Sequence, residues 1–259
     1  MRVGSWNVNG LRAAARKGMA EHLPRLGLDV IVLQEIRCSE AQVPDPSPVP
    51  PGWHTEWACG SRAGHAGVAI WSSRPMVRLD PGPDAPDTDG RLLYVEIDGW
   101  RIAGLYLPSG SAGPDRQALK EAWMEGFRPW LDRVRRDPVP TLVLGDWNLA
   151  PHERDVHSYK RAGVLSGFLP HERAWINDVL ASGWEDTVRR LAGDRAGPYS
   201  WWSNFGRARA EDRGWRIDLV LANPAAAPRV TAFHIDPEAP RVLRPRAGDC
   251  RSRGAMRAC

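Results

Sequence analysis

The sequence has no apolar run near the roughly 18 residues that a membrane-spanning helix needs. Residues 1–9 lead directly into a strand-like pattern, without the apolar stretch of a secretion signal. The cysteines lack the close pairwise spacing of a metal site and are too few for a disulfide framework. They are Cys38, Cys59, Cys250 and Cys259. We therefore expect a cytoplasmic protein with no membrane partner.

A strong excess of one charge is also missing from most of the chain. The 259 residues have a formal net charge of +4 and a pI near 9.1. Residues 236–259 hold six arginines and three acids, a net of +3, so residues 1–235 are nearly neutral. Charge alone is therefore weak evidence for a polyanionic partner.

Short apolar runs of strand length, bounded by turn residues, recur instead along the chain. They are Val3–Asn7, Val30–Gln34, Gly67–Ser72, Leu92–Ile97, Ile102–Leu107, Thr141–Gly145 and Arg216–Ala222. Several are continuously apolar, as expected of strands buried on both faces. Asp98-Gly99 between two of them predicts a hairpin turn.

Three segments between these runs have the apolar period of helices, namely Leu11–Leu26, Arg116–Val134 and Glu172–Leu180. The second places Leu119 with Trp123 and Phe127 near one face. Strands outnumber helices, which favours an α/β fold of two sheets packed face to face with helices outside, over a doubly wound parallel sheet. We find no linker and no repeat. We predict one domain over residues 1–235, followed by an atypical arginine-rich tail over residues 236–259.

Carboxylates and carboxamides stand where the apolar strands end. Strand ends that converge on one edge of a sandwich place such groups in one pocket. Mg²⁺ prefers oxygen ligands, commonly one or two carboxylates with water and phosphate, and Mn²⁺ takes similar ligands. A lone Asn or Asp at a strand end is more often a turn former, so spacing alone predicts no more than a possible metal hydrolase. The residues are Asn7, Asn9, Glu35, Asp146, Asn148 and Asp218.

At these residues the sequence resembles the exodeoxyribonuclease III branch of the endonuclease/exonuclease/phosphatase superfamily. The resemblance extends from Met1 to about Ile235, and the Gly-Phe-Leu-Pro and Gly-Trp-Arg-Ile-Asp segments are closest to this DNA-repair branch. The matching segments are Ser5–Arg12, Leu33–Arg37, Gly104–Gly110, Gly145–Asn148, Ser166–Pro170, Glu172–Trp175 and Gly214–Asp218.

The resemblance implies a four-layer α/β sandwich like that of deoxyribonuclease I, and the activity of a metal-dependent DNA phosphodiesterase. Its substrates are double-stranded DNA with abasic sites and 3′ ends, incised 5′ to the abasic site. It implies that Glu35, with Asn7, binds Mg²⁺. Tyr106 contacts the scissile phosphate, Asp146 orients or deprotonates the attacking water, and Asn148 hydrogen-bonds the phosphate. We expect a monomer.

Other matched positions are expected to meet the substrate. Trp201 and Trp215 match residues that line the pocket for a base-less sugar, where an apolar wall excludes a nucleotide with its base. Asn9 is a substrate-binding candidate in the first motif. Arg91 is a candidate for phosphate contact, as are Arg12 and Arg74 more weakly.

The family normally closes with Ser-Asp-His-Ala-Pro, a string that this sequence lacks. In the family, Asp218 would support the histidine of that motif. One synonymous coding of Val242 to Asp249, read after dropping its first base, gives Ser-Ser-Asp-His-Ala-Pro-Val. We therefore hypothesise a frameshift between Ile235 and Val242. Codons other than CGA, CCA and CGC at Arg244, Pro245 and Arg246 would contradict it.

If the tail is genuine, we expect it to replace the last strand, expose a sheet edge and impair activity. Two alternatives to the repair nuclease stay open. One is a superfamily phosphatase or phosphodiesterase that acts on another phosphoester, such as a phospholipid or inositol phosphate. The other is a DNA-binding remnant that has lost catalysis. The two motifs closest to the DNA-repair branch favour DNA as the substrate.

Overall fold

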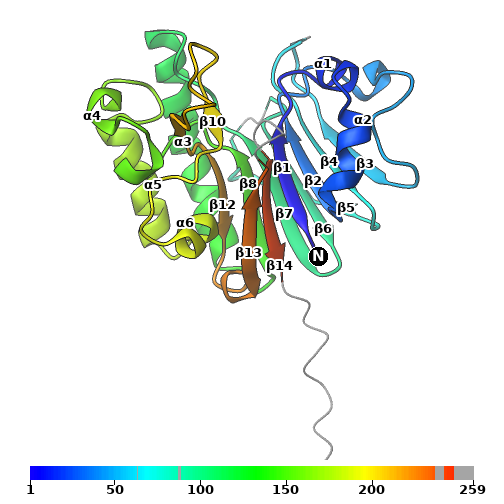
Figure 1. Cartoon of the computed structure of the whole chain (residues 1–259). Coiled ribbons are helices and arrows are strands. Elements are labelled where there is room, and N and C mark those ends of the chain that lie inside the picture. The colour runs from blue at the N-terminus through cyan, green and yellow to red at the C-terminus, as the bar shows by residue number, and fades with distance from the viewer. Residues whose placement is uncertain (63, 87–88, 237–241, 248–259) are drawn as a thin grey trace, which may run out of the picture.

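The computed structural model describes residues 1–62, 64–86, 89–236 and 242–247, the last range by its backbone. Two six-stranded sheets face each other, with helices on both outer sides (Figure 1). The predicted two-sheet sandwich of four layers is therefore confirmed. Within these ranges, no helix is long and apolar enough to cross a membrane.

The first sheet combines strands from both ends of the chain. Its order is β13-β14-β1-β2-β4-β3, with β1 and β2 parallel and the other neighbours antiparallel. The strands are β1 (Val3–Asn7), β2 (Val30–Gln34), β3 (His54–Ala58), β4 (Val68–Ser72), β13 (Val230–Ile235) and β14 (Val242–Ala247).

The second sheet is built from the middle of the chain, in the order β5-β6-β7-β8-β12-β9, with β7 and β8 parallel. Its strands are β5 (Val77–Arg78), β6 (Leu92–Ile97), β7 (Trp100–Tyr106), β8 (Thr141–Asp146), β9 (Glu185–Asp186) and β12 (Asp218–Ala222). A separate two-stranded ribbon pairs β10 (Trp201–Trp202) with β11 (Gly214–Trp215).

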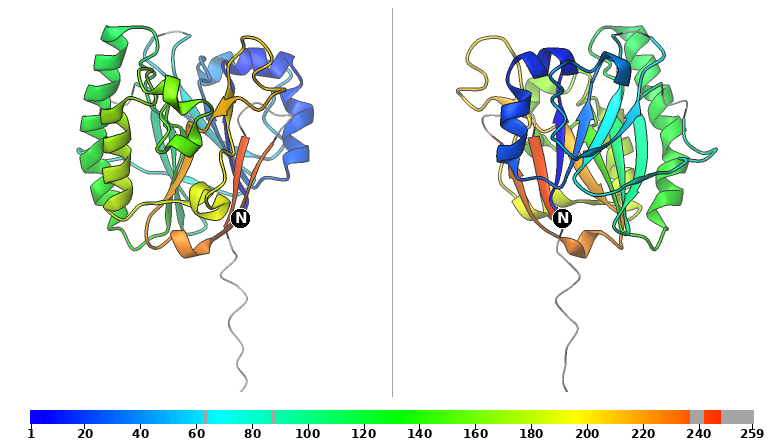
Figure 2. Two further views of the ribbon diagram at one scale, coloured as in Figure 1. Left: turned by 60° about the vertical axis from the view of Figure 1, so that its left-hand side comes forward. Right: turned by 90° about the vertical axis from the view of Figure 1, so that its right-hand side faces the viewer.

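Helices cover the outer face of each sheet, as the two turned views in Figure 2 show. The first sheet carries α1 (Leu11–Arg16), α2 (Met19–His22) and the 3₁₀ turn η1 (Leu23–Leu26), and the second carries α3 (Pro114–Arg135) and α5 (Pro170–Ala181). The shorter helices are η2 (Glu40–Gln42), η3 (Glu153–Asp155), α4 (Tyr159–Ala162), α6 (Thr187–Ala192) and η4 (Ala227–Arg229).

Burial on both faces explains the continuously apolar strands. In β2, Val30 and Val32 point between the sheets, where they join one core cluster with residues of the second sheet. Ile31 and Leu33 point the other way and pack under α1 and α2. Successive side chains of a strand alternate between faces, so both sets must be apolar here.

Two details of the predicted helices were wrong. The segment Leu11–Leu26 is broken at Gly18, whose φ of +84° is left-handed and ends a continuous helix. In α3, Leu119 is 45% exposed, whereas the neighbouring Lys120 is fully buried. The apolar face of α3 therefore includes a lysine, which a count of apolar residues does not reveal.

The tail does not leave the first sheet with the open edge that we expected. The backbone of β14 pairs antiparallel with β1 on one side and with β13 on the other. That expectation was wrong, because residues 242–247 supply a strand of their own. The proposed domain boundary at residue 235 stays a prediction, since residues 237–241 and 248–259 lie outside the described residues.

Candidate active site

Asn7 joins the ends of the two sheets at one point. It is the last residue of β1, and its side-chain nitrogen donates to Glu35 Oε1 and to Asp146 Oδ2, each at 2.7 Å. Glu35 directly follows β2 in the same sheet, and Asp146 ends β8 in the other sheet. The predicted convergence of strand ends is therefore present, and it crosses the interface between the sheets.

Three residues of this edge have a left-handed backbone: Asn9, Glu35 and Asn148, with φ of +49°, +53° and +49°. Such angles are uncommon outside glycine, and they cluster at functional sites where the surrounding structure enforces them. The side-chain oxygen of Asn7 accepts the N–H of Asn9 at 3.0 Å. Glu35 also forms an ion pair with Arg37. The backbone is thus bent to present polar side chains at one place.

Asp146 and Asn148 are held together by a hydrogen bond. The backbone N–H of Asn148 donates to Asp146 Oδ1 at 3.0 Å, and its side-chain amide donates to the carbonyl of Leu107 at 2.8 Å. Asp146 is only 1% exposed. Asp218 is fully buried and lies opposite Asp146 in the antiparallel pairing of β12 with β8. The two aspartates are therefore neighbours.

Tyr106 ends β7, beside these carboxylates. Burial raises the pKa of its phenol, and the negative charges of Glu35 and Asp146 raise it further. Tyr106 therefore stays protonated well past neutral pH, and its hydroxyl donates a hydrogen bond to Glu35.

Arg91 lies behind Tyr106 rather than on the surface. It is 6% exposed, its guanidinium carbon lies 5.1 Å from the centre of the Tyr106 ring, and it contacts His65 Nε2 at 3.2 Å. Burial lowers the pKa of His65, and the charge of Arg91 lowers it further. The role of Arg91 in phosphate contact stays a prediction, and His65 is a neighbour that no sequence pattern had singled out.

A cavity of about 600 Å³ opens over this edge. Its lining includes Glu35, Tyr106 and Asn148, and Asn7 and Asp146 are hydrogen-bonded to Glu35 and Asn148, respectively; we call these five residues the polar wall. Trp201 and Trp215 also line the cavity, and we call them the aromatic wall. The two tryptophan rings meet edge to face, with centroids 6.4 Å apart. The cavity thus has a polar wall and an aromatic wall.

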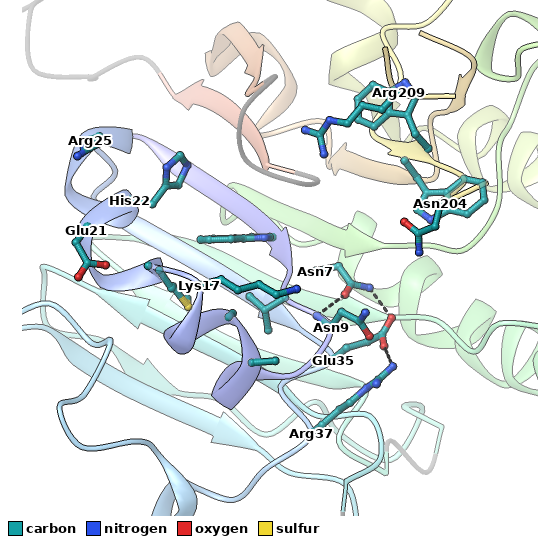
Figure 3. A pocket seen from close by; sticks show the side chains of 18 of the residues that line it. Asn7, Asn9, Lys17, Glu21, His22, Arg25, Glu35, Arg37, Asn204 and Arg209 are labelled. Carbon is teal, nitrogen blue, oxygen red and sulfur yellow. Dashed lines mark hydrogen bonds and ion pairs between the residues drawn. The ribbon is translucent and has the colours of Figure 1, made fainter. Parts of the chain in front are cut away.

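A second cavity of about 780 Å³ adjoins the first and shares Glu35 and Trp201 with it. Figure 3 shows Asn7, Asn9 and Glu35 together on one side of it, with Asn204 and Arg209 across from them. The Arg209 guanidinium lies 5.0 Å from the centre of the Trp202 ring. This side of the site is polar and partly cationic.

The residues at this edge fit a hard divalent cation with few protein ligands. Glu35 and Asp146 both lie within hydrogen-bond distance of Asn7, so two carboxylates and an amide group meet. Across the described part of the chain, no cluster of three or more His, Cys, Asp or Glu side chains is arranged to hold a metal. Mg²⁺ often takes only one or two carboxylates and completes its shell with water and substrate phosphate.

Arg74, a weak candidate for phosphate contact, lies away from this site. Arg74 forms ion pairs with Asp98, in the turn between β6 and β7, and with Asp29, just before β2. Both positions are at the opposite ends of these strands from Glu35 and Tyr106. Arg74 therefore lies away from this site, and its contact with phosphate stays a prediction.

Sequence reasoning missed the buried ion pair of Lys120 and Glu172 beneath the site. A signal was available for Lys120. It lies one turn before Trp123 and two turns before Phe127, so helical geometry places it on their buried face. A lysine at such a position needs a partner, which the sequence does not identify.

Comparisons with known proteins agree with this geometry. The pattern of the endonuclease/exonuclease/phosphatase family matches residues 4–249. The chain is 31% identical over 232 residues to the DNA repair nuclease APEX1 of Danio rerio, covering 88% of this chain and 74% of that protein. It is 30% identical over 226 residues to an exodeoxyribonuclease of Bacillus subtilis, covering 86% of this chain and 88% of that protein.

A third relative is much longer than this chain. The recombination repair protein 1 of Drosophila melanogaster is 29% identical over 238 residues, which cover 91% of this chain and 35% of that protein. Among solved structures, an AP endonuclease from Archaeoglobus fulgidus has the same fold, with a TM-score of 0.84 at 22% identity over 95% of this chain and 99% of that one. The chain therefore belongs to the endonuclease/exonuclease/phosphatase family.

Proposed function

We propose that this chain is a DNA phosphodiesterase of base-excision repair, which incises the strand 5′ to abasic sites and removes nucleotides from 3′ ends. The observation that best supports this proposal is the cavity of about 600 Å³, whose lining combines the acid Glu35, the amide of Asn148 and the phenol of Tyr106 with two tryptophans. Membership of a hydrolase family with nuclease relatives supports the reaction type. We further propose that the chain acts as a monomer in the cytoplasm.

On the polar wall, Glu35 and Asn7 are the residues that would hold a divalent ion, Mg²⁺ or alternatively Mn²⁺. When bound, such an ion neutralises charge on the phosphate and so favours attack at phosphorus. The Glu35 carboxylate is already fixed by Asn7 and by Arg37. The protein therefore orients this ligand before any substrate arrives.

The remaining groups of the polar wall divide the work on water and phosphate. Asp146 accepts hydrogen bonds from the Asn7 amide and from the backbone N–H of Asn148, which fix its carboxylate in the direction needed to orient and deprotonate a water. Asn148 uses one amide N–H on Leu107 and has a second for a phosphate oxygen. Tyr106, held protonated, is a further donor to the developing negative charge.

The aromatic wall supplies substrate choice. Trp201 and Trp215 face each other across the β10–β11 ribbon, and Phe168 packs edge to face on Trp215 with centroids 6.2 Å apart. A wall of this kind accepts the apolar face of a deoxyribose and leaves little room for an attached base. It supports DNA with a missing base as the substrate, rather than a lipid or inositol phosphate.

The missing Ser-Asp-His motif lowers the expected activity of the chain as it stands. In the family this motif brings a histidine to the phosphate and gives Asp218 its partner. Groups that act as a unit fail together, so we expect the reaction to be slower by orders of magnitude than with the motif in place. The specific alternative is abasic-DNA binding without cleavage.

The test is cleavage of a duplex with a single abasic site, in Mg²⁺ and in Mn²⁺. The chain is compared with a version whose reading frame is restored from Val242 onward, and with that version carrying Asp146→Asn. Incision 5′ to the site by the restored version, lost on Asp146→Asn, supports the proposal. Failure of both unsubstituted proteins to cut abasic DNA would refute it, and tight binding without incision would favour the alternative.

A further inference from the structure

The feature that carries a further inference is a buried ion pair beneath the two walls of the cavity. Lys120 of α3 and Glu172 of α5 are both fully buried, with Nζ 2.5 Å from Oε1. Transfer of two charges out of water costs stability, and a well-packed apolar pair would often serve the fold as well. The pair therefore calls for an explanation beyond packing, and its other contacts provide one.

On one side the pair reaches the polar wall. Lys120 Nζ donates to the backbone carbonyl of Asn148 at 2.8 Å. Asn148 has a left-handed backbone, and its side chain is our candidate phosphate donor. The Lys120 ammonium group, bonded to the Asn148 carbonyl, fixes the peptide plane between residues 148 and 149. The position of this plane helps to set the direction in which the side-chain amide of Asn148 points.

On the other side the pair reaches the loop behind the aromatic wall. Glu172 Oε2 accepts the N–H groups of Gly167 at 2.7 Å and Leu169 at 3.0 Å. The carbonyl of Gly167 in turn accepts the N–H of Ala150 at 2.8 Å. One carboxylate thus ties the loop 167–169 to the strand end that carries Asn148.

Gly167 lies between the two walls. It has a φ of +94°, and a Cβ added to it would stand 3.0 Å from the carbonyl oxygen of Asn148 and 3.4 Å from the ring of Trp215. Gly167 is therefore the single residue between Asn148, which faces the phosphate, and the Trp215 ring, which faces the sugar. Any shift of the loop 167–169 moves the two walls relative to each other.

We propose that Lys120 and Glu172 form a positioning pair, which sets the distance between Asn148 and the Trp215 wall. This inference rests on the proposed function, because it assigns the pair a part in that reaction. A shift of even 1 Å in a reacting group can lower a rate by about 100-fold. The pair touches neither phosphate nor sugar, and it acts through the backbone that it holds.

Two double variants separate the two halves of the pair without leaving a lone buried charge. Lys120→Met with Glu172→Gln removes the bond to Asn148 but keeps an oxygen for the amides of the loop 167–169. Lys120→Met with Glu172→Met removes both. Val179→Ala, a fully buried position further along α5, is the control for loosened packing of that helix.

Two readouts are measured on the full chain and its variants. The first is the single-turnover rate of abasic-site incision in Mg²⁺, and the second is the ratio of Kd values for undamaged and tetrahydrofuran-containing duplexes in EDTA. We expect the Met/Gln variant to lose up to about 100-fold in rate with its Kd ratio kept. The Met/Met variant should also lose about tenfold in the Kd ratio, and Val179→Ala should lose only thermal stability.

The outcomes distinguish the two proposals. If the Met/Met variant folds and keeps both the rate and the Kd ratio of the unchanged chain, the positioning pair is refuted. If neither the unchanged chain nor its frame-restored version incises abasic DNA but both prefer to bind it, the proposed function fails, and the Kd ratios of the variants alone decide the inference. If neither of these two proteins incises abasic DNA or prefers to bind it, both proposals are refuted.

Discussion

The two walls of the candidate site are built by different means. On the polar wall, single side chains at strand ends hydrogen-bond to one another across the two sheets, with Asn7 between Glu35 and Asp146. On the aromatic wall, a short ribbon carries two tryptophans over a buried ionic network. The polar wall thus depends mainly on direct contacts between functional groups, with the buried Lys120–Glu172 pair supporting Asn148. The aromatic wall depends on groups that never reach the cavity.

The network under the aromatic wall is centred on Arg216, the residue after Trp215. Its guanidinium is fully buried and donates to both oxygens of Asp155, at 2.7 and 2.9 Å, and to Asp186 at 3.1 Å. Arg189 forms a further ion pair with Asp155. Changes to the polar wall should therefore alter chemistry at nearly constant stability. Changes to this network should alter stability first.

The largest expected effect is on the polar wall. Asp146→Asn keeps the shape of the side chain but removes the base, so we expect the incision rate to fall by a factor of about 10² to 10⁴. The free energy of unfolding should change little. Single-turnover incision in the frame-restored background and urea unfolding measure the two quantities. Equal incision rates with and without the Asp146→Asn substitution would remove this residue from the mechanism.

Next in size is the loss of the network. Arg216→Met leaves the buried carboxylates of Asp155 and Asp186 without their main partner, and we expect a loss of about 3–5 kcal/mol in the free energy of unfolding. The matched control is Arg133→Met, whose ion pair with Asp84 is exposed and should contribute no more than about 1 kcal/mol. Urea titration gives both values. Similar losses in the two variants would contradict the assigned role of the network.

A smaller effect is expected when the aromatic wall itself is changed. Trp215→Leu removes the edge-to-face contacts with Trp201 and Phe168, so the preference for abasic over undamaged duplex should fall about tenfold. Trp100→Leu, at the far end of β7, is the control and should leave this preference unchanged. Competition binding measures the ratio. An unchanged preference in Trp215→Leu would place substrate choice elsewhere.

The smallest expected effect is on thermal stability at low pH. Burial alone would raise the pKa of Asp155, but the charges of Arg216 and Arg189 outweigh it and hold the pKa below its usual value. An aspartate with a lowered folded-state pKa stabilises the fold above its unfolded pKa of about 3.9, and loses that contribution as the pH falls further. We expect a steeper loss of thermal stability below about pH 4 in the unchanged chain than in Asp155→Asn with Arg216→Met. Parallel curves would show that Asp155 is not the group responsible.

Much of the polar wall was predictable because its signals are local. An apolar strand that ends in Asn7, or in Asp146 and Asn148, is visible in consecutive residues. Parallel pairing then brings the ends of β1 and β2 together in one sheet and those of β7 and β8 together in the other. The hairpin at Asp98-Gly99 was predictable for the same reason, since both residues have the left-handed backbone that such turns require. Local chemistry dictates these features without reference to the rest of the fold.

The supporting residues were not predictable, because their partners are distant along the chain. Lys120 and Glu172 are 52 residues apart, and Arg216 and Asp155 are 61 apart. Charged residues are usually solvated, so an isolated Arg or Lys in the sequence gives no sign that it is buried. The break at Gly18 was missed because an apolar period continues on both sides of it.

The order of strands in the first sheet has a consequence for how the protein is made. The strand β14 lies between β13 and β1, so the second neighbour of β1 leaves the ribosome after the other described strands of this sheet. Until then, β1 has only β2 beside it and presents a row of open N–H and C=O groups to any other chain. The strand that ends in Asn7 thus completes its hydrogen bonding only after β14 has been made. A chain that terminates before β14 would leave one edge of β1 unpaired, and other chains could add to that edge and aggregate.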